Sequence, residues 1–438
     1  MDWKKIYQEK LRTPEEAIRE NVHSGYSVFG GGTSLPVTCY NVMLKMIDEG
    51  ELDGITLHIH SPCNEGMEFD QYNFSRDQLW VPTWFMNAPD RELVKQKKFT
   101  YMPLQYGMLT RYIEHMDPDI CILLMSPPDE NGNCNIGPNG YNTPALRHCK
   151  KIIAQISKYV PRVNGTFHDF HVSELAAIVE ADDPIAIQNH PATASPEEQK
   201  ISEHILNFIP DGACIQLGIG GIANAVGFGL RDRKHLGVYS EILTDSIVDL
   251  MEDGIIDNSR KKLYPGQSCI GFCFGSQRQY DYINDNKDFI FLGFEDLINV
   301  KNIASIDNMI SINAAVSVDL TGQVCAESIG HRQYSGTGGQ IDFVRGASMS
   351  KGGYSFIALP SLAHTRQDGV KSRIVAEFDP GSIVTTPRTD VHYVVSEYGA
   401  VCLQFCDIPT RVKRMISIAH PDYREELTFQ AKKAGLLY

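Results

Sequence analysis

Residues 213–223 read Ala-Cys-Ile-Gln-Leu-Gly-Ile-Gly-Gly-Ile-Ala, a short apolar run that meets a cluster of glycines. Such a run predicts a buried strand that turns sharply into a helix, here reaching about Leu230. The alternating residues 235–241, His-Leu-Gly-Val-Tyr-Ser-Glu, predict the next strand. The order of strand, glycine turn, helix and strand is typical of parallel sheets, which bind ligands at the carboxyl ends of their strands.

The first half of the chain repeats this order. Residues 26–29 form a short apolar run, a turn of three glycines follows, residues 35–47 have a helical pattern, and residues 54–60 alternate. Further strands are predicted over residues 120–125, 151–156, 268–274, 309–312, 355–359 and 393–396. We therefore expect an α/β protein with two related parallel-sheet domains.

The polar, proline-bearing stretch 181–195 has no period and predicts the linker between these domains. We expect domains over residues 1–190 and 191–438. At the end of the linker, Ser195 can cap a helix with Pro196 at its first position and acidic residues in its first turn. A helix of about three turns toward Phe208 is predicted, and the second domain begins there.

Composition excludes several classes of protein. The chain has 438 residues, of which 42% are hydrophobic and 21% charged, as expected for an ordered globular protein. Its net charge of −14 and the lack of a basic run argue against a nucleic-acid partner. No apolar stretch reaches the ~18 residues of a membrane span, so no membrane partner is expected. The odd count of 11 cysteines, without a C-x-x-C pair, predicts free thiols in the cytoplasm and no metal site.

The turn at residues 218–223 also matches the pattern G-x-G-x-x-G/A. Glu241 follows about twenty residues later, where a dinucleotide-binding fold would hold a ribose hydroxyl. An NAD-dependent dehydrogenase is therefore one interpretation. In another, the glycines only allow a helix to pack tightly against a sheet.

A second glycine cluster, Ser-Gly-Thr-Gly-Gly-Gln-Ile-Asp-Phe at residues 335–343, is not required by a dehydrogenase. In its residue types and their spacing, the chain resembles the acetyl-CoA hydrolase/transferase family, and within it the butyryl-CoA and 4-hydroxybutyrate CoA-transferases. The resemblance covers nearly the whole chain. Its segments are residues 1–7, 126–129, 216–221, 239–241, 335–343, 394–399 and 419–422.

The resemblance implies parallel-sheet domains of the NagB/RpiA-like CoA-transferase type and a ping-pong exchange between a short-chain acyl-CoA and acetate. It implies that Glu241 becomes acylated and then holds CoA as a γ-thioester. It further implies a cytoplasmic homo-oligomer that uses CoA as a substrate and has no permanently bound cofactor. The residues that it assigns to CoA are Gly218, Ile219, Gly220, Gly221, Ile222, Asn313, Val316, Gly338, Gly339 and Arg366, and those that it assigns to an acyl pocket are Gly30, Gly31 and Gly32.

Several alternatives remain open from the sequence. Glu327 and Glu397 also lie in family-like stretches, where Glu327 would brace the second glycine loop and Glu397 would anchor a turn. Water could release the same enzyme thioester, which would make the protein an acyl-CoA hydrolase. A ligand-sensing module without turnover is a further alternative. The glycines at 30–32 either line a pocket for chains of about four carbons or only turn the chain.

Overall fold

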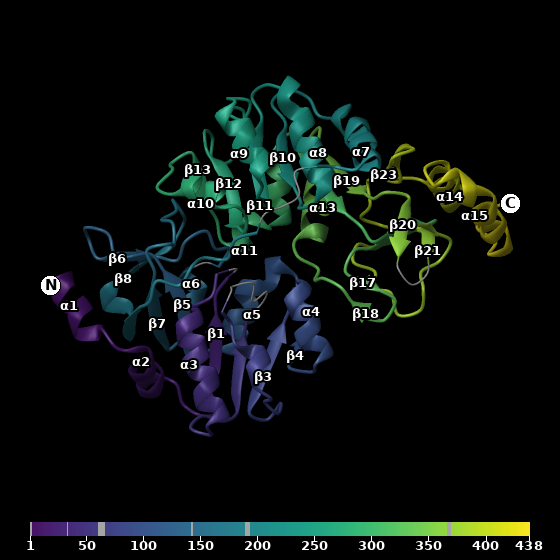
Figure 1. The fold of residues 1–438 in the computed structure, drawn as a ribbon. Helices are drawn as coiled ribbons and strands as arrows, with labels where there is room; N and C mark the ends of the chain where they lie inside the picture. The colour runs from purple at the N-terminus through teal and green to yellow at the C-terminus, as the bar shows by residue number, and fades with distance from the viewer. Residues whose placement is uncertain (1, 33, 60–65, 142, 189–192, 366–368) are drawn as a thin grey trace. The chain divides into compact units, whose positions relative to one another are not determined.

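Two groups of residues, each containing a parallel sheet, make up the fold (Figure 1). The structure is a computed structural model that describes residues 2–32, 34–59, 66–141, 143–188, 193–365 and 369–438. Unit 1 comprises Met1–Asn189 and Ile270–Asp296, and unit 2 comprises His190–Cys269 and Leu297–Tyr438. Residues 270–296, which the sequence analysis assigned to the second domain, thus group with the first unit.

The apolar runs of the first half form a sheet in the order β4-β3-β2-β1-β5-β7-β9, with every neighbouring pair parallel. Its strands are β1 (Ser27–Gly30), β2 (Ile55–His58), β3 (Leu79–Thr83), β4 (Phe99–Tyr101), β5 (Ile120–Met125), β7 (Lys151–Ile156) and β9 (Ala177–Glu180). The helices of residues 1–189 are α1 (Trp3–Lys10), α2 (Pro14–Asn21), α3 (Val37–Asp48), α4 (Ala88–Lys95), α5 (Leu109–Met116) and α6 (Thr143–Leu146). Val28, Leu57, Ile122 and Ile153 from these strands belong to one buried apolar cluster, which holds the sheet against its helices.

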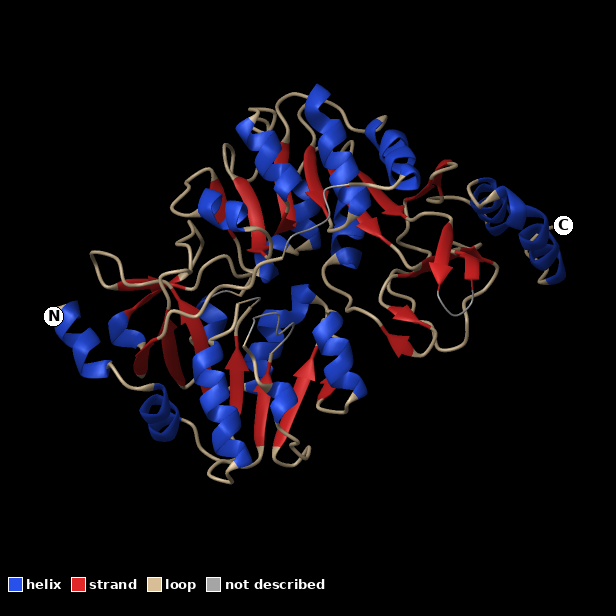
Figure 2. Ribbon diagram, viewed as in Figure 1, coloured by secondary structure: helices blue, strands red, loops and turns tan. Residues whose placement is uncertain are grey.

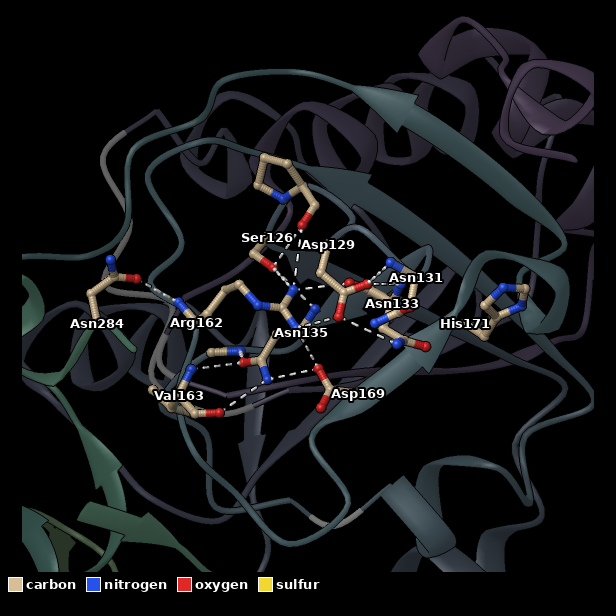
Figure 3. A network of polar contacts seen from close by, with 12 residues as sticks. Ser126, Asp129, Asn131, Asn133, Asn135, Arg162, Val163, Asp169, His171 and Asn284 are labelled. Carbon is tan, nitrogen blue, oxygen red and sulfur yellow. Dashed lines mark hydrogen bonds and ion pairs between the residues drawn. The ribbon is translucent and has the colours of Figure 1, made fainter. Parts of the chain in front are cut away.

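A polar network centred on Arg162 supports the antiparallel pair of β6 (Asn133–Asn135) and β8 (Asp169–His171), as Figure 3 shows. The Arg162 guanidinium donates to Ser126 Oγ at 3.2 Å, to Asn133 O at 2.9 Å and to Asp169 Oδ1 at 2.9 Å. It also forms an ion pair of 3.5 Å with Asp129. The family-like segment 126–129 therefore belongs to a structural network of unit 1.

The segment of unit 1 that follows residue 269 contains most of β12 (Ser268–Cys273), α10 (Gln277–Ile283), β13 (Phe289–Phe291) and most of α11 (Phe294–Leu297). The Tyr280 hydroxyl donates to the Ala186 carbonyl at 2.8 Å, and the Gln188 amide donates to the Gly275 carbonyl at 2.9 Å. Contacts between residues some ninety positions apart such as these are invisible to local sequence patterns.

In unit 2 the strands are ordered β11-β10-β14-β19-β23-β24. All neighbours are parallel except β23 and β24, which are antiparallel. The strands are β10 (Cys214–Leu217), β11 (Gly237–Leu243), β14 (Met309–Ala314), β19 (Tyr354–Ala358), β23 (Tyr393–Ser396) and β24 (Gly399–Cys402). Helices lie in the chain between β10 and β11 and between β14 and β19, as in other α/β folds (Figure 2), whereas the described part of the connection from β19 to β23 contains only short strands.

The helices of unit 2 are α7 (Pro196–Leu206), α8 (Gly221–Gly229), α9 (Asp245–Glu252), α12 (Val300–Ser305), α13 (Gln340–Met349), α14 (Ile408–Ser417) and α15 (Pro421–Lys433). Smaller sheets pair β15 (Ser317–Asp319) with β16 (Val324–Cys325) and β22 (Ile374–Val375), β17 (Ser328–Ile329) with β18 (Arg332–Gln333), and β20 (Leu362–Thr365) with β21 (Gly369–Ser372). Within the described ranges, no helix combines the length and apolar character that crossing a membrane requires.

The predicted strands are confirmed in position, and the class is α/β with parallel sheets, as expected. One boundary differs, because β11 runs on to Leu243 and places Glu241 inside the strand rather than at its last residue. The predicted cap is also confirmed. Ser195 Oγ accepts the Glu198 amide at 3.3 Å while Glu198 Oε2 accepts the Ser195 amide at 2.8 Å, a capping box.

Replacing Arg162 by Met should destabilise unit 1 by roughly 1–3 kcal/mol, because the substitution leaves two carboxylates and a hydroxyl without their charged donor. The measurement is the thermal melting temperature. Lys158→Met is the control, since it removes an ion pair in which both side chains are more than half exposed, with exposed fractions of 60% and 51%. An equal loss in both variants would contradict a structural role for the network.

Candidate functional site

Three strand ends of unit 2 meet at the carboxyl edge of the sheet. Leu217 of β10 pairs with Ile312 of β14, and the Gly218 amide donates to the Ile312 carbonyl at 3.2 Å. On the other side of β10, Ser240 Oγ donates to the Leu217 carbonyl at 3.3 Å. Glu241, the next residue, therefore lies beside the glycine turn at the edge where parallel sheets bind ligands.

The first glycine turn requires its glycines for different reasons. Gly220 has a φ of +110°, a conformation that L residues rarely adopt. A Cβ on Gly221 would lie 2.1 Å from Glu198 Oε2, so the carboxylate that caps α7 packs against the first residue of α8. A Cβ on Gly218 would meet only the Ile312 carbonyl, at 3.5 Å. The turn leaves the first backbone amides of α8 free to donate hydrogen bonds to an anion.

The second glycine turn holds Glu241. Gly339 is the N-cap of α13, and its backbone amide donates a hydrogen bond to the Glu241 carboxylate. A Cβ on Gly339 would lie 2.3 Å from Glu241 Oε2 and 3.0 Å from Ile298 Cδ1. Gly338 has a φ of +57°, which favours glycine and aims the following amide. Both residues are buried, and the site has no room for a side chain at 339.

The environment of Glu241 makes its carboxyl unusually basic. Burial raises the pKa of Glu241 to about 7. The amide of Gly339 opposes this rise by stabilising the charged form, and the carboxylate of Asp342 adds to it. A half-buried carboxylate with this pKa is a stronger nucleophile than an exposed one, and it is still ionised in about half of the molecules at neutral pH.

Asn313 and Val316 lie on and after β14, next to the first glycine turn. The Asn313 amide group donates to Ser311 Oγ at 2.8 Å and to Gln216 Oε1 at 3.3 Å, contacts that fix its orientation at the sheet edge. Val316 is half-buried in the turn between β14 and β15. Arg366, also predicted to contact CoA, lies outside the described residues.

The two rival glutamates have structural partners. Glu327 is buried, and its carboxylate accepts from Gln333 Nε2 at 3.0 Å and from Thr337 Oγ1 at 3.4 Å. Glu397 accepts from the amide of Ser361 at 2.8 Å and from its hydroxyl at 2.5 Å. These contacts brace the second glycine loop and join the ends of β19 and β23, as the sequence analysis considered for both residues.

The glycines at 30–32 in unit 1 are closely packed. A Cβ on Gly30 would lie 1.9 Å from the Tyr40 hydroxyl, and one on Gly31 would lie 2.9 Å from Leu123 Cδ2. Gly32 has a φ of +66°, and a Cβ there would meet Asn139 Nδ2 at 2.5 Å. All three residues are buried, so any larger residue here would disturb the packing of unit 1 itself.

Sequence reasoning missed two charged residues near the site. Asp342, in the first turn of α13, acts electrostatically on Glu241. Arg373 is half-buried, and burial lowers its pKa while the negative charges of Glu198 and Glu397 oppose the shift. The signal for Asp342 was available, since it lies three residues after Gly339 in the second glycine cluster. Arg373 follows a short strand far along the chain and has no local signal.

Within the described ranges, no three His, Cys, Asp or Glu side chains gather as a metal ion would require. The described cysteines are free thiols, and all but Cys402 and Cys406 are buried. The groups that the described residues offer for chemistry at this edge include the Glu241 carboxylate and backbone amides. Such a set suits acyl transfer, in which a carboxylate attacks and amides stabilise an oxyanion.

Parallel α/β units with a basic carboxylate between two glycine turns define a class of enzyme that processes acyl groups, and comparison with known proteins gives the family. The model of the acetyl-CoA hydrolase/transferase N-terminal domain matches residues 1–189, and that of the C-terminal domain matches residues 275–431. The chain belongs to the acetyl-CoA hydrolase/transferase family, and it is a CoA-transferase.

Individual relatives match over their full length. The 4-hydroxybutyrate coenzyme A transferase of Clostridium kluyveri is 37% identical over 99% of this chain and 100% of its own. The butyryl-CoA:acetate CoA-transferase of Anaerostipes caccae is 34% identical over 100% of this chain and 99% of its own. The crystal structure of RipA from Yersinia pestis superposes with a TM-score of 0.91 at 34% identity, covering all of both chains.

Gly339→Ala should lower kcat for CoA transfer by roughly 10²-fold, because the new methyl group must displace the Glu241 carboxylate by about 1 Å. The measurement is the initial rate of transfer at saturating substrate, with the melting temperature measured alongside. A variant that melts like the wild type and keeps its rate would show that the contact between Gly339 and Glu241 does not position the nucleophile.

Proposed function

We propose that this CoA-transferase exchanges CoA between a short-chain acyl-CoA, such as butyryl-CoA or 4-hydroxybutyryl-CoA, and acetate, with Glu241 as the nucleophile. The observation that carries the proposal is the half-buried Glu241 carboxylate, which accepts the Gly339 amide at the carboxyl edge of a parallel sheet. The substrate class is inferred from the names of the relatives.

The reaction needs only a carboxylate and oriented amides. The Glu241 carboxylate attacks the thioester carbonyl, which gives a mixed anhydride and the CoA thiolate. The thiolate then attacks the glutamyl carbonyl, which releases the donor acid and leaves CoA on Glu241 as a thioester. The acceptor acid retraces these steps and departs as the new acyl-CoA, so the energy of the thioester is retained.

The two glycine turns have separate parts in this proposal. The Gly339 amide donates to the Glu241 carboxylate, so the same donor is suited to the oxyanion that forms when the thiolate attacks the glutamyl carbon. Residues 218–222 and the start of α8 are suited to bind the phosphates of CoA, with Asn313, Val316 and Gly338 nearby. Arg366 and the acyl pocket at residues 30–32 remain part of the proposal. Contacts to the distant parts of CoA would supply the binding energy that orients the thioester.

The proposal also keeps the remaining expectations. The enzyme would act as a cytoplasmic homo-oligomer that uses CoA only as a substrate and has no permanent cofactor. Its domains would be residues 1–190 and 191–438, except that residues 270–296 group with unit 1, and the nucleophile would lie in the second. Because each methylene in a pocket contributes only about 1–3 kcal/mol, related short-chain substrates should overlap in use.

Incubation with butyryl-CoA should produce a covalent CoA adduct that is visible by intact-protein mass spectrometry. Glu241→Ala should abolish the adduct because it removes the carboxylate that becomes the thioester. Glu327→Gln is the matched control, since it neutralises a glutamate of unit 2 with structural partners, and it should retain an adduct if it folds. The absence of an adduct in the wild type, or its survival in Glu241→Ala, would refute the proposed mechanism.

A hydrolase is the second candidate because the family model covers both hydrolases and transferases. Acetate added to the isolated adduct separates the two activities. A transferase yields acetyl-CoA, whereas a hydrolase releases free CoA thiol at a rate that does not depend on acetate. The match to the acetyl-CoA hydrolase/transferase family replaces the dehydrogenase and the ligand-sensing module that the sequence left open.

The rate of adduct formation should follow the ionisation of Glu241. Since only the carboxylate attacks, kcat/KM should decline below a midpoint near pH 7, set by the raised pKa of Glu241, and fall about tenfold per pH unit further down. A midpoint near pH 4.5, the ordinary value for a glutamate, would contradict the described environment of Glu241.

The same raised pKa makes a prediction about stability that does not depend on activity. Between pH 4.5 and about 7 the folded protein keeps the Glu241 proton that the unfolded chain has lost, so this group lowers stability as the pH rises through that window. Glu241→Gln should therefore raise the melting temperature at pH 8 by more than it does at pH 5. Equal effects at the two pH values would contradict the shift.

A further inference from the structure

We propose that Asp342 is a positioning residue whose negative charge repels the ionised Glu241 carboxylate and so favours the acylated form of the enzyme. The inference rests on the proposed role of Glu241 and deepens it. Asp342 is not proposed to contact the substrate. It would act on the nucleophile from the helix that already holds Glu241.

The geometry of α13 places Asp342 on the same helical turn as the residue that lies against Glu241. Gly339 is the N-cap of this helix and Asp342 is its third residue, so both lie on one face of the first turn. The Gly339 amide donates a hydrogen bond to the Glu241 carboxylate. A Cβ added to Gly339 would lie 2.3 Å from Glu241 Oε2, so the backbone of Gly339 packs directly against this carboxylate. The turn that fixes Glu241 therefore also presents Asp342 to it.

Asp342 lacks the bond that an acid at this position usually makes. In a capping box, the third residue of a helix accepts the backbone amide of the N-cap residue. Here the amide of the N-cap residue, Gly339, donates to Glu241 instead, and α13 has no side-chain cap bond. Asp342 Oδ2 is buried and has no hydrogen-bond partner in the described part of the chain. Asp342 therefore has an unpaired buried oxygen on the turn of α13 that begins at Gly339.

Other charges do little to neutralise this pair. Arg345, one turn further along α13, lowers the pKa of Asp342, but its guanidinium is held by Asp390 at 3.0 Å. Burial outweighs Arg345 and raises the pKa of Asp342 to about 6. Asp342 is therefore largely ionised at neutral pH, where Glu241 is only partly ionised.

The elements packed against α13 supply no competing charge. These elements are α12, β14 and β19. The side chains of β14 are not ionisable, and β19 carries only Tyr354. Lys301 of α12 is exposed to solvent. Asp342 is the charged side chain that acts on Glu241 among the described residues.

The repulsion acts on one side of the reaction only. In the free enzyme above about pH 7, Glu241 and Asp342 are both negatively charged. When Glu241 becomes an anhydride it is neutral and the negative charge leaves on the CoA thiolate. When the thiolate then forms the thioester, the charge leaves on the donor carboxylate, so charge balances without any added proton. The repulsion is lost in the adduct, which shifts the equilibrium toward it, and the raised basicity strengthens Glu241 as a nucleophile.

The first test measures adduct formation from butyryl-CoA against pH in Asp342→Asn, Asp342→Ala and Asp342→Glu. In the Asn and Ala variants we expect the midpoint on the acid side of the pH profile to move to lower pH by roughly one unit. The equilibrium yield of adduct should fall roughly tenfold. Asp342→Glu should restore the wild-type midpoint because it keeps the charge. If the pH profile of adduct formation shifted only in Asp342→Asn, the new amide donor would be responsible. If the profile kept its midpoint and the rate fell equally at every pH, Asp342 would have a structural role. Either result would overturn the proposal.

The second test is a double-mutant cycle of stability between Asp342→Asn and Glu241→Gln. At pH 8 each single substitution should relieve the same repulsion, so the double variant should gain less in melting temperature than the sum. At pH 5, where both carboxyls are protonated, the effects should add. Additive effects at pH 8 would overturn the proposal even if Glu241 proves to be the nucleophile. A wild type that forms no adduct would instead refute the proposed function and leave the cycle as the measure of repulsion.

Discussion

One hydrogen bond, from the backbone amide of Gly339 to the carboxylate of Glu241, joins the strand that carries the proposed nucleophile to helix α13. The bond requires a helix that begins directly above the sheet edge and a residue without a side chain at that point. Gly338 adopts the positive φ of the turn that leads into the helix, and Gly339 leaves free the space that a Cβ would take from the Glu241 carboxylate. The parallel register of β10 and β14 places the first glycine turn at the same edge.

The site balances opposing effects on one charge. Burial and the neighbouring Asp342 disfavour the ionised Glu241, while the Gly339 amide favours it, and the result is a pKa of about 7. A carboxylate that was fully stabilised would be a poor nucleophile, and one that was fully desolvated would stay protonated. The intermediate value keeps a usable fraction of a reactive anion near neutral pH.

The sequence predicted what local patterns can encode. Apolar runs followed by glycines located the strand ends of both units, and Ser195, Pro196 and Glu198 located the start of α7. Because ligands in parallel folds bind at those strand ends, Glu241 and both glycine turns could be singled out. Their roles in catalysis stay a prediction.

The rest depends on contacts between distant residues. The grouping of residues 270–296 with unit 1 follows from bonds such as that between Tyr280 and Ala186, which no periodicity signals. Asp342 influences Glu241 because α13 begins at Gly339, the residue that lies against Glu241, and the tight packing of Gly31 depends on Leu123 of β5. In each case the chemistry of the residue is readable from the sequence, but its neighbour is not.

Glu198 shows how the start of a helix can fix a distant loop. The carboxylate that closes the capping box of α7 also fills the space where Gly221 would carry a side chain, so the end of the polar segment before Pro196 and the first glycine turn share one group. A hybrid enzyme that joins the N-terminal segment of one relative to the C-terminal segment of another should therefore be cut before Ser195. A junction between Ser195 and Gly221 would separate the cap from the turn that it supports, and the recombined chain would lose the shape of the first glycine turn.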